Sequence, residues 1–249
     1  MKTRVIVKLD VKPPYVVKPV HFEGLRKIGS PAELATAYYQ QGADEIYYID
    51  IVASLYQRDI LDVLIKETAE ALYIPFAVGG GIKNIEDCKL LFNSGADKII
   101  INTFAAQSNP QLINDAARIF GSQAVCVNIE AKKIDDDWLC LTDCGRISSG
   151  RKVYEWAKEV ESRGAGEILL QSVDRDGRQR GFDVELAKRV VDGLNIPVVV
   201  ASGAGSLKDI GDLVKHAKPS GVAISSLIHY KINNIKDIKK YLNNLSLEP

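Results

Sequence analysis

The sequence predicts an α/β fold, a (β/α)8 TIM barrel with a twofold internal repeat of half-barrels. Eight short, apolar, β-branched segments alternate with helical patterns along the 249 residues, as in a parallel sheet buried on both faces. The segment at 74–84, IPFAVGGGIKN, recurs at 196–206 as IPVVVASGAGS, 122 residues further on (196 − 74). We therefore expect one barrel domain over residues 1–249, with half-barrels at about 1–122 and 123–249. An open doubly wound sheet is the alternative, but it does not predict the repeat.

Local signals justify the elements of the first half. Ser30 and Pro31 suit the N-cap and first turn of a helix. The two prolines at 13 and 14 indicate a long loop over Val11–Ile28. The strands are expected at Arg4–Asp10, Glu45–Ile51, Phe76–Val78 and Asp97–Ile101, and the helices at Pro31 to about Gly42, about Asp59–Leu72, Asn84–Asn93 and about Pro110–Phe120.

The second half follows the same order, with an insert after its first strand. Within Lys132–Ser149, three aspartates form a solvated turn, and a returning strand is expected at Trp138–Thr142. The strands are expected at Ala124–Glu130, Glu167–Val173, Val198–Ala201 and Gly221–Ser225, and the helices at Arg151–Arg163, Asp183–Gly193, Ser206–Ala217 and Ile235–Asn243.

Composition excludes several classes of function. Lys plus Arg and Asp plus Glu number 32 each, so the chain has no overall attraction for nucleic acid or an anionic membrane. No apolar run reaches the ~18 residues of a membrane span, and the chain starts directly with a strand, so we expect a cytoplasmic protein. The four cysteines form no CxxC pair and there are only three histidines, so neither a metal site, a disulfide framework nor a cofactor is expected.

Two repeat-related carboxylates are the candidate catalytic residues. A TIM barrel carries its active site at the carboxyl ends of its strands. Asp10 ends the first strand and Glu130 ends the fifth, so they are expected to face each other across the barrel mouth. One carboxylate on each side of a bound substrate suits acid–base catalysis. A strand-end carboxylate can also merely cap a helix or pair with a lysine.

Glycine-rich strand ends are the candidate phosphate sites. Bare backbone N–H groups at a strand-to-helix turn bind anions, although such a segment can also be a plain tight turn. The matching ends of strands three and four and of strands seven and eight imply a long substrate with a phosphate at each end. The candidate binding residues are Lys18, Asp50, Gly80, Gly81, Asn102, Thr103, Ser172, Asp174, Asp176, Gly177, Gly203, Ser225 and Ser226.

Charged residues also begin four of the expected strands. Arg4, Glu45, Lys98 and Glu167 are expected to converge at the bottom of the barrel. They form either a stabilising ring of salt bridges or a gate into the barrel bore.

Motifs along essentially the whole chain resemble the cyclase subunit of imidazole glycerol phosphate synthase. They include LDVK at 9–12, FEGLR at 22–26, VGGGI at 78–82, DKIIIN at 97–102, SVDRDG at 172–177 and ASGAGSL at 201–207. The related isomerase of histidine synthesis fits these motifs less well. The resemblance implies that ammonia reacts with a bisphosphorylated ribulosyl aminoimidazole carboxamide, and imidazole glycerol phosphate and an aminoimidazole carboxamide ribotide are released.

The resemblance also implies roles for single residues. It implies Asp10 and position 130 as the acid–base pair, and the two phosphate sites with Lys18 close by. It implies a glutaminase partner at the N-terminal face of the barrel, with which the chain forms a heterodimer. The four charged residues at the strand starts match the family's ammonia gate.

Departures from the family pattern cluster at the active face. Glu130 stands where the family has Asp, Lys8 stands where Cys is usual, and KPPYVVKP at 12–19 replaces a polar segment. These changes leave open a paralogous ammonia-using subunit that acts on a nucleotide-activated sugar for surface polysaccharides. A non-catalytic module that scaffolds a glutaminase is a third hypothesis.

Overall fold

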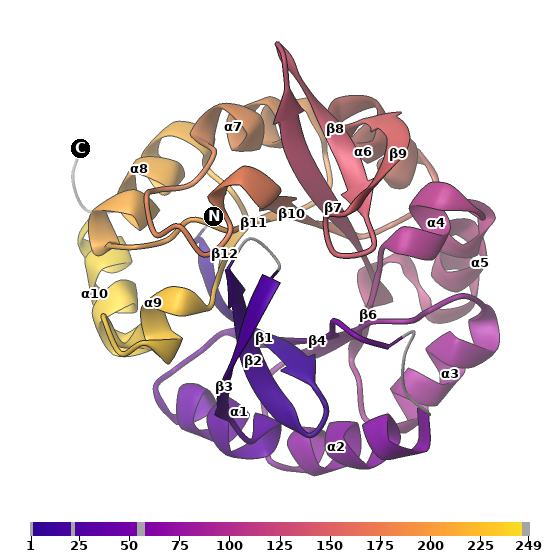
Figure 1. Cartoon of the computed structure of the whole chain (residues 1–249), viewed down its shortest axis with the longest axis horizontal. Helices are drawn as coiled ribbons and strands as arrows, with labels where there is room; N and C mark the ends of the chain where they lie inside the picture. Colours follow the sequence, from indigo (N-terminus) through magenta and orange to yellow (C-terminus); the bar gives the residue numbers. More distant parts are fainter. Residues whose placement is uncertain (1, 21–22, 54–57, 246–249) are drawn as a thin grey trace.

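Eight parallel strands close into a barrel in the computed structural model of the chain, which describes residues 2–20, 23–53 and 58–245 (Figure 1). The barrel strands are β1 (Arg4–Lys12), β4 (Glu45–Asp50), β5 (Phe76–Gly79), β6 (Lys98–Ile101), β7 (Val125–Ile134), β10 (Glu167–Ser172), β11 (Val198–Ala201) and β12 (Gly221–Ile224). Each pairs in parallel with the next, and pairing of β12 with β1 and of β7 with β10 closes the ring. The predicted TIM barrel is therefore confirmed.

Helices surround the barrel and cover the outer faces of its strands (Figure 1). They are α1 (Pro31–Gln40), α2 (Arg58–Glu70), α3 (Ile85–Asn93), α5 (Gln111–Phe120), α6 (Val153–Ser162), α7 (Val184–Gly193), α8 (Leu207–Ala217) and α10 (Ile235–Leu245). Each buries an apolar stripe; in α5, for example, Leu112, Ile113 and Ala116 are buried. Asn84 starts α3 by accepting a hydrogen bond from the Asp87 N–H, so the helix begins directly after the glycine-rich end of β5.

An antiparallel hairpin extends the first strand of each half. β2 (Tyr15–Val20) and β3 (Glu23–Gly29) continue from β1, so the expectation of an irregular loop over Val11–Ile28 is wrong. The Val-rich segment of β2 has high strand propensity, and this outweighs the break at the two prolines. β8 (Asp137–Thr142) and β9 (Ile147–Lys152) continue from β7, which confirms the returning strand. Because β9 runs to Lys152, α6 begins later than expected.

The two halves have the same order of elements. In each, the first strand carries a hairpin, and the fourth strand leads into a short helix: α4 (Thr103–Gln107) after β6, and α9 (Ser226–His229) after β12. Short 3-10 turns, η1 (Ser122–Ala124) and η2 (Val173–Arg175), complete the secondary structure of the described residues. The division into half-barrels of one domain near residue 122 stays a prediction, which this shared order supports.

Alternation along the strands separates two apolar layers. In β1, Val5, Val7 and Leu9 pack outward against the helices, whereas Ile6 packs into the barrel interior. The interior layer consists of Ile6, Tyr47, Ala77, Ile100, Cys126, Leu169, Val199, Ala201 and Ala223. Within the described ranges, none of the helices has both the length and the apolar character that crossing a lipid bilayer demands.

Candidate active site

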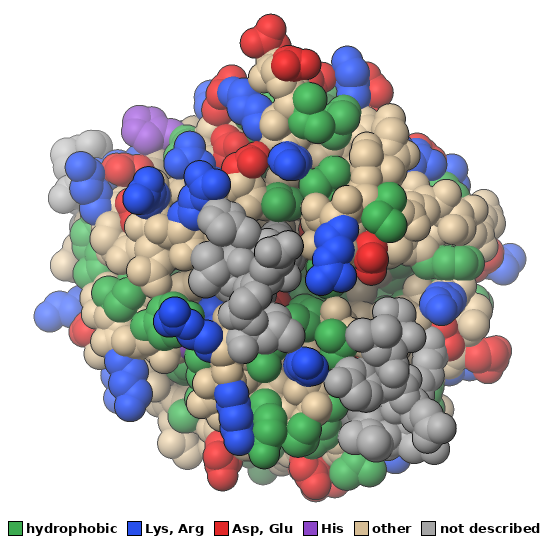
Figure 2. All heavy atoms as spheres, viewed as in Figure 1, with side chains coloured by type: hydrophobic (Ala, Val, Ile, Leu, Met, Phe, Trp, Pro, Cys, Tyr) green, Lys and Arg blue, Asp and Glu red, His purple; other side chains and the backbone are tan. Residues whose placement is uncertain are grey.

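The carboxyl ends of the strands enclose two adjoining cavities. The face that holds them is turned toward the viewer in Figures 1 and 2, and Lys and Arg side chains are spread over it. The larger cavity, about 320 Å³, is lined by the ends of β5 and β6 and by both candidate catalytic residues. The smaller cavity, about 20 Å³, is lined by the ends of β11 and β12. Lys8 and Gln171 line both cavities, so they lie where the two meet.

Asp10 is buried between two lysines. It is 2% exposed, and the Nζ of Lys8 donates a hydrogen bond to its Oδ1. The Nζ of Lys18, on β2, lies 3.7 Å from its Oδ2. Burial would raise the pKa of Asp10, but the two ammonium groups outweigh burial and hold that pKa below its ordinary value. Asp10 is therefore ionised at neutral pH.

Glu130 is equally buried but has only neutral donors against its carboxylate. Asn102 Nδ2 donates to Oε1 at 2.9 Å, and the backbone N–H of Gly145, in the β8–β9 turn, donates to Oε2 at 2.7 Å. Burial dominates over these hydrogen bonds and raises the pKa of Glu130 to about 7. Near neutral pH this side chain is present in both protonated and ionised forms.

The two carboxylates lie on opposite strands of the ring. Four strand-to-strand steps separate β1 from β7 in either direction, and both side chains line the larger cavity. Two carboxyl groups whose surroundings push their pKa values apart are suited to act as a base and an acid on one ligand. The structure thus brings Asp10 and Glu130 together as predicted from the repeat.

The glycine-rich end of β5 allows a close approach to the backbone. Gly80 has φ of 116°, and a Cβ there would lie 2.4 Å from the carbonyl oxygen of Asp50. Gly81, Asn102 and Thr103 line the same end of the larger cavity. Asp50 lines it too, and its Oδ1 accepts a hydrogen bond from the N–H of Val52 at 2.9 Å.

The end of β11 repeats this geometry. Gly203 has φ of 114°, and a Cβ there would lie 2.3 Å from the carbonyl oxygen of Gly181. The Oγ of Ser202 donates to Oδ1 of Asp176 at 3.3 Å, and Lys18 Nζ lies 3.5 Å from the same oxygen. The predicted residues that line the smaller cavity are Lys18, Asp176, Gly177, Gly203, Ser225 and Ser226. A cavity of this size holds about one water molecule, so lining side chains must shift before an anion as large as phosphate can enter.

Two predicted binding residues lie outside both cavities. Asp174 Oδ2 accepts a hydrogen bond from the backbone N–H of Lys133 at 2.8 Å, so it supports the hairpin that extends β7. Ser172 is buried at the end of β10 but lines neither cavity. Their role in substrate binding stays a prediction that the two cavities do not support: Ser172 follows the mouth-lining Gln171 on β10 and so faces the other side of the strand, and Asp174 lies in the 3-10 turn η2 beyond it.

The sequence reasoning missed two contributors to the site. Gln171 is a single amide in an apolar strand, directly before the predicted Ser172, and its polarity was the signal that could have revealed it. Gly145 reaches Glu130 through a turn in which Asp143 and Cys144 also have positive φ. This turn folds over the mouth through tertiary contacts, such as that of the Asp143 N–H with Thr103 Oγ1, which no local motif specifies.

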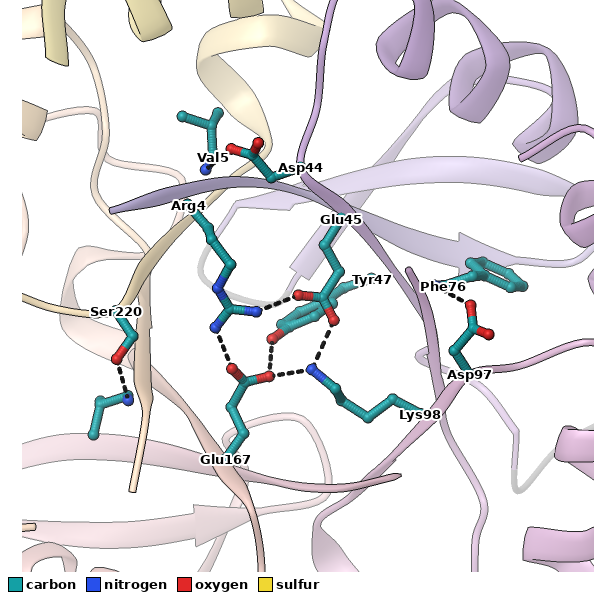
Figure 3. A network of polar contacts seen from close by, with 11 residues as sticks. Arg4, Val5, Asp44, Glu45, Tyr47, Phe76, Asp97, Lys98, Glu167 and Ser220 are labelled. Carbon is teal, nitrogen blue, oxygen red and sulfur yellow. Dashed lines mark hydrogen bonds and ion pairs between the residues drawn. The ribbon is translucent and has the colours of Figure 1, made fainter. Parts of the chain in front are cut away.

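The four charged residues at the strand starts form a closed ring at the opposite face (Figure 3). Arg4 bonds to Glu45 at 2.6 Å and to Glu167, and Lys98 bonds to Glu45 at 2.8 Å and to Glu167 at 2.6 Å. Tyr47 donates to Glu167 Oε2 at 2.8 Å from the interior layer. Burial would raise the pKa of Glu167, but Lys98 and Arg4 lower it overall.

Known proteins of one kind match this sequence over most of its length. Residues 4–234 match the family described as "Histidine biosynthesis protein". The chain is 51% identical over 207 residues to the imidazole glycerol phosphate synthase subunit HisF of Legionella pneumophila, covering 83% of this chain and 97% of that protein. It is 44% identical over 239 residues to the HisF subunit of Thermococcus onnurineus (96% and 94% covered) and 43% identical over 245 residues to that of Saccharolobus solfataricus (98% and 97% covered).

The raised pKa of Glu130 predicts a stability effect that depends on pH. The folded-state pKa of about 7 exceeds the ordinary value of 4.5, so the folded chain binds the extra proton between these values. This preferential proton binding adds about 3 kcal/mol to the free energy of unfolding. The added stability is fully present below about pH 4.5 and is lost as the pH rises through 7. Urea unfolding of the wild type and of Glu130→Gln from pH 4.5 to 8 measures this difference. Glu67→Gln, at an exposed position of α2, is the control. If the free energy of unfolding of Glu130→Gln changed with pH in the same way as that of the wild type, the prediction would be contradicted.

Proposed function

This chain belongs to the histidine biosynthesis protein family and, within it, to the HisF subunits of imidazole glycerol phosphate synthase, and we propose that it is the cyclase of that enzyme. It uses ammonia to convert the bisphosphorylated ribulosyl aminoimidazole carboxamide substrate to imidazole glycerol phosphate and the aminoimidazole carboxamide ribotide. The observation that carries the proposal is the opposed pair Asp10 and Glu130, with divergent pKa values, in a mouth with a glycine-rich end on either side.

The electrostatics of the two carboxylates support different roles in this proposal. Asp10 is ionised, so it accepts a proton from the ammonia nitrogen as that nitrogen bonds to the substrate carbonyl carbon. Glu130 carries a proton in part of the molecules at neutral pH, so it donates to the oxygen that leaves as water. The strand ends at Gly81 and Gly203 hold the two phosphates, which fixes the carbonyl between the carboxylates.

Asp10→Asn and Glu130→Gln test the acid–base assignment. Each removes one proton carrier while keeping the size of the side chain, so we expect ammonium-dependent kcat to fall by about 10²- to 10⁴-fold. Turnover of the bisphosphate substrate with ammonium chloride measures the loss, and Asp136→Asn in the exposed β7–β8 turn is the control. Unchanged turnover in Asp10→Asn would contradict the role of Asp10 as a proton carrier, whereas a wild type without any turnover would favour a scaffold without catalysis.

A glutaminase subunit docks, in this proposal, at the face that holds the charged ring. Two large apolar side chains are exposed at that end: Tyr73, 85% exposed just before β5, and Ile119, 48% exposed near the end of α5. Exposed aromatic and aliphatic groups around a polar centre are typical of a protein interface.

Tyr73→Asp is expected to weaken binding of the glutaminase subunit at least about 10-fold, because a charge replaces an apolar contact at the interface. Isothermal titration calorimetry with the purified glutaminase measures the affinity. Tyr15→Asp, on the hairpin at the opposite face, is the matched control. Equal affinities of the two variants would place the interface elsewhere.

The ring itself acts as the ammonia gate. It lies at the entrance to the barrel, and the interior apolar layer separates it from the mouth. Lys98 contributes two of the four ion pairs and is 14% exposed at its side chain, so its ammonium group is placed to open or close the entrance.

Lys98→Met is expected to lower glutamine-dependent turnover at least about 5-fold while ammonium-dependent turnover stays within about 2-fold, because added ammonium reaches the mouth from solvent. Ratios of the two activities in the assembled complex measure the effect. Lys89→Met, at an exposed position of α3, is the control. A parallel fall in both activities would show a structural role for the ring.

A second candidate function rests on two residues of the mouth. Lys8 and Glu130 differ from the family pattern, and both line the larger cavity. They favour a paralogous ammonia-using subunit that acts on a nucleotide-activated sugar. The ammonium assay decides, because this alternative requires that the bisphosphate substrate is not turned over. In either case the four free cysteines are consistent with a cytoplasmic location.

A further inference from the structure

Lys8 places a buried ammonium group at the centre of the barrel mouth. It is 5% exposed and borders both cavities, so a ligand that reaches from one to the other passes it. An ammonium group has three N–H donors. Among the described residues, Asp10 Oδ1 is the acceptor within hydrogen-bond distance of Lys8 Nζ. Donors therefore remain for a bound ligand.

Gln171 places an acceptor at the same junction. Its Nε2 donates to Oδ1 of Asn128 at 2.9 Å, which fixes the orientation of the amide. Its Oε1 is buried and, within the described part of the chain, has no hydrogen-bond partner. A buried acceptor without a partner is unusual in a folded protein and is satisfied when a ligand donates to it. Gln171 is 2% exposed, so bulk water does not take this role.

We propose that Lys8 and Gln171 form a central subsite that binds hydroxyl groups in the middle of a substrate whose two ends are phosphates. This inference rests on the proposed function, because the two anion-binding ends position the middle segment. Lys8 and Gln171 are then specificity-determining residues: they select a polyol or sugar chain over an apolar linker of equal length.

The chemistry of the two groups favours a hydroxyl over other middle groups. Lys8 Nζ only donates and Gln171 Oε1 only accepts, whereas a hydroxyl does both. A third phosphate is disfavoured, because it cannot donate to Gln171 and would lie near ionised Asp10. An apolar middle segment would leave the buried groups unpaired, and sites built to bind a hydroxyl strongly reject analogues that lack it.

Binding of two bisphosphates to the full chain tests the subsite. A polyol chain with a phosphate at each end and the alkane-diol bisphosphate of equal length, each as long as the proposed substrate, have the same end groups, but only the first has middle hydroxyls. We expect calorimetry to give at least about 10-fold tighter binding of the polyol bisphosphate. In Lys8→Met and Gln171→Leu this ratio falls to about 2 or less. Lys12→Met, at the exposed end of the same strand, keeps the wild-type ratio.

The outcomes separate the subsite from the proposed function. If the wild type binds neither bisphosphate, the two-ended anion site of the proposed function is wrong, and the subsite falls with it. If the wild type binds both bisphosphates equally, or if both variants keep the wild-type ratio of affinities, the central subsite is overturned. The two phosphate-binding ends of the proposed function are then unaffected. If Lys8→Met does not fold, Gln171→Leu decides, because it removes the acceptor without unpairing a charge.

Discussion

The buried ion pair between Lys8 and Asp10 is the interaction on which the active face depends. Two charges are stable inside a protein only when they are paired, so the closed barrel must hold both groups in contact. Asp10 stays ionised although it is buried, because its neighbours are cations. Glu130, at the repeat-related position 120 residues later, has Asn128 where the first half has Lys8. The two similar carboxylates have opposite tendencies to bind a proton because Asp10 lies between the ammonium groups of Lys8 and Lys18, whereas Glu130 receives its hydrogen bonds from an amide and a backbone N–H.

The same asymmetry explains why a symmetric fold supports an asymmetric reaction. The glycine-rich ends at Gly80 and Gly203 are matched in φ and in their close approach to a carbonyl oxygen, so the halves are alike where the proposed function places identical groups, the two phosphates of the substrate. The halves differ at the centre of the mouth, where, in the proposed reaction, Asp10 accepts a proton from the nitrogen and Glu130 donates one to the leaving oxygen. The hairpins follow this division too: β2 brings Lys18 to Asp10, whereas the β8–β9 turn brings a backbone N–H to Glu130.

Sequence reasoning predicted the parts of the fold and the site that local pattern and repetition determine. The strands, the outer helices, the opposed carboxylates and the ring at Arg4 follow from hydrophobic period and from the 122-residue offset. The missing parts depend on tertiary contacts. Asp174 lies in the 3-10 turn η2 after β10 and there accepts a hydrogen bond from the N–H of Lys133, and Gly145 meets Glu130 through a turn with positive φ. The strands β2 and β3 were not predicted, because the two prolines before β2 indicate a loop, whereas the valines of β2 pair with β1.

In the proposed function ammonia crosses the barrel from the charged ring to the mouth, and the apolar interior layer decides in which form it crosses. Below it, the ring offers two cations and two anions in mutual contact; above it, the mouth holds Asp10 in its ionised form. An ammonium ion that entered between Ile6 and Leu169 would lose its hydration without gaining a partner, whereas neutral ammonia loses far less. The layer therefore favours the unprotonated nucleophile. In the proposed reaction Asp10 then needs to accept only the proton released when the new carbon–nitrogen bond forms, and its low pKa is compatible with that task because the nitrogen becomes strongly acidic as it bonds.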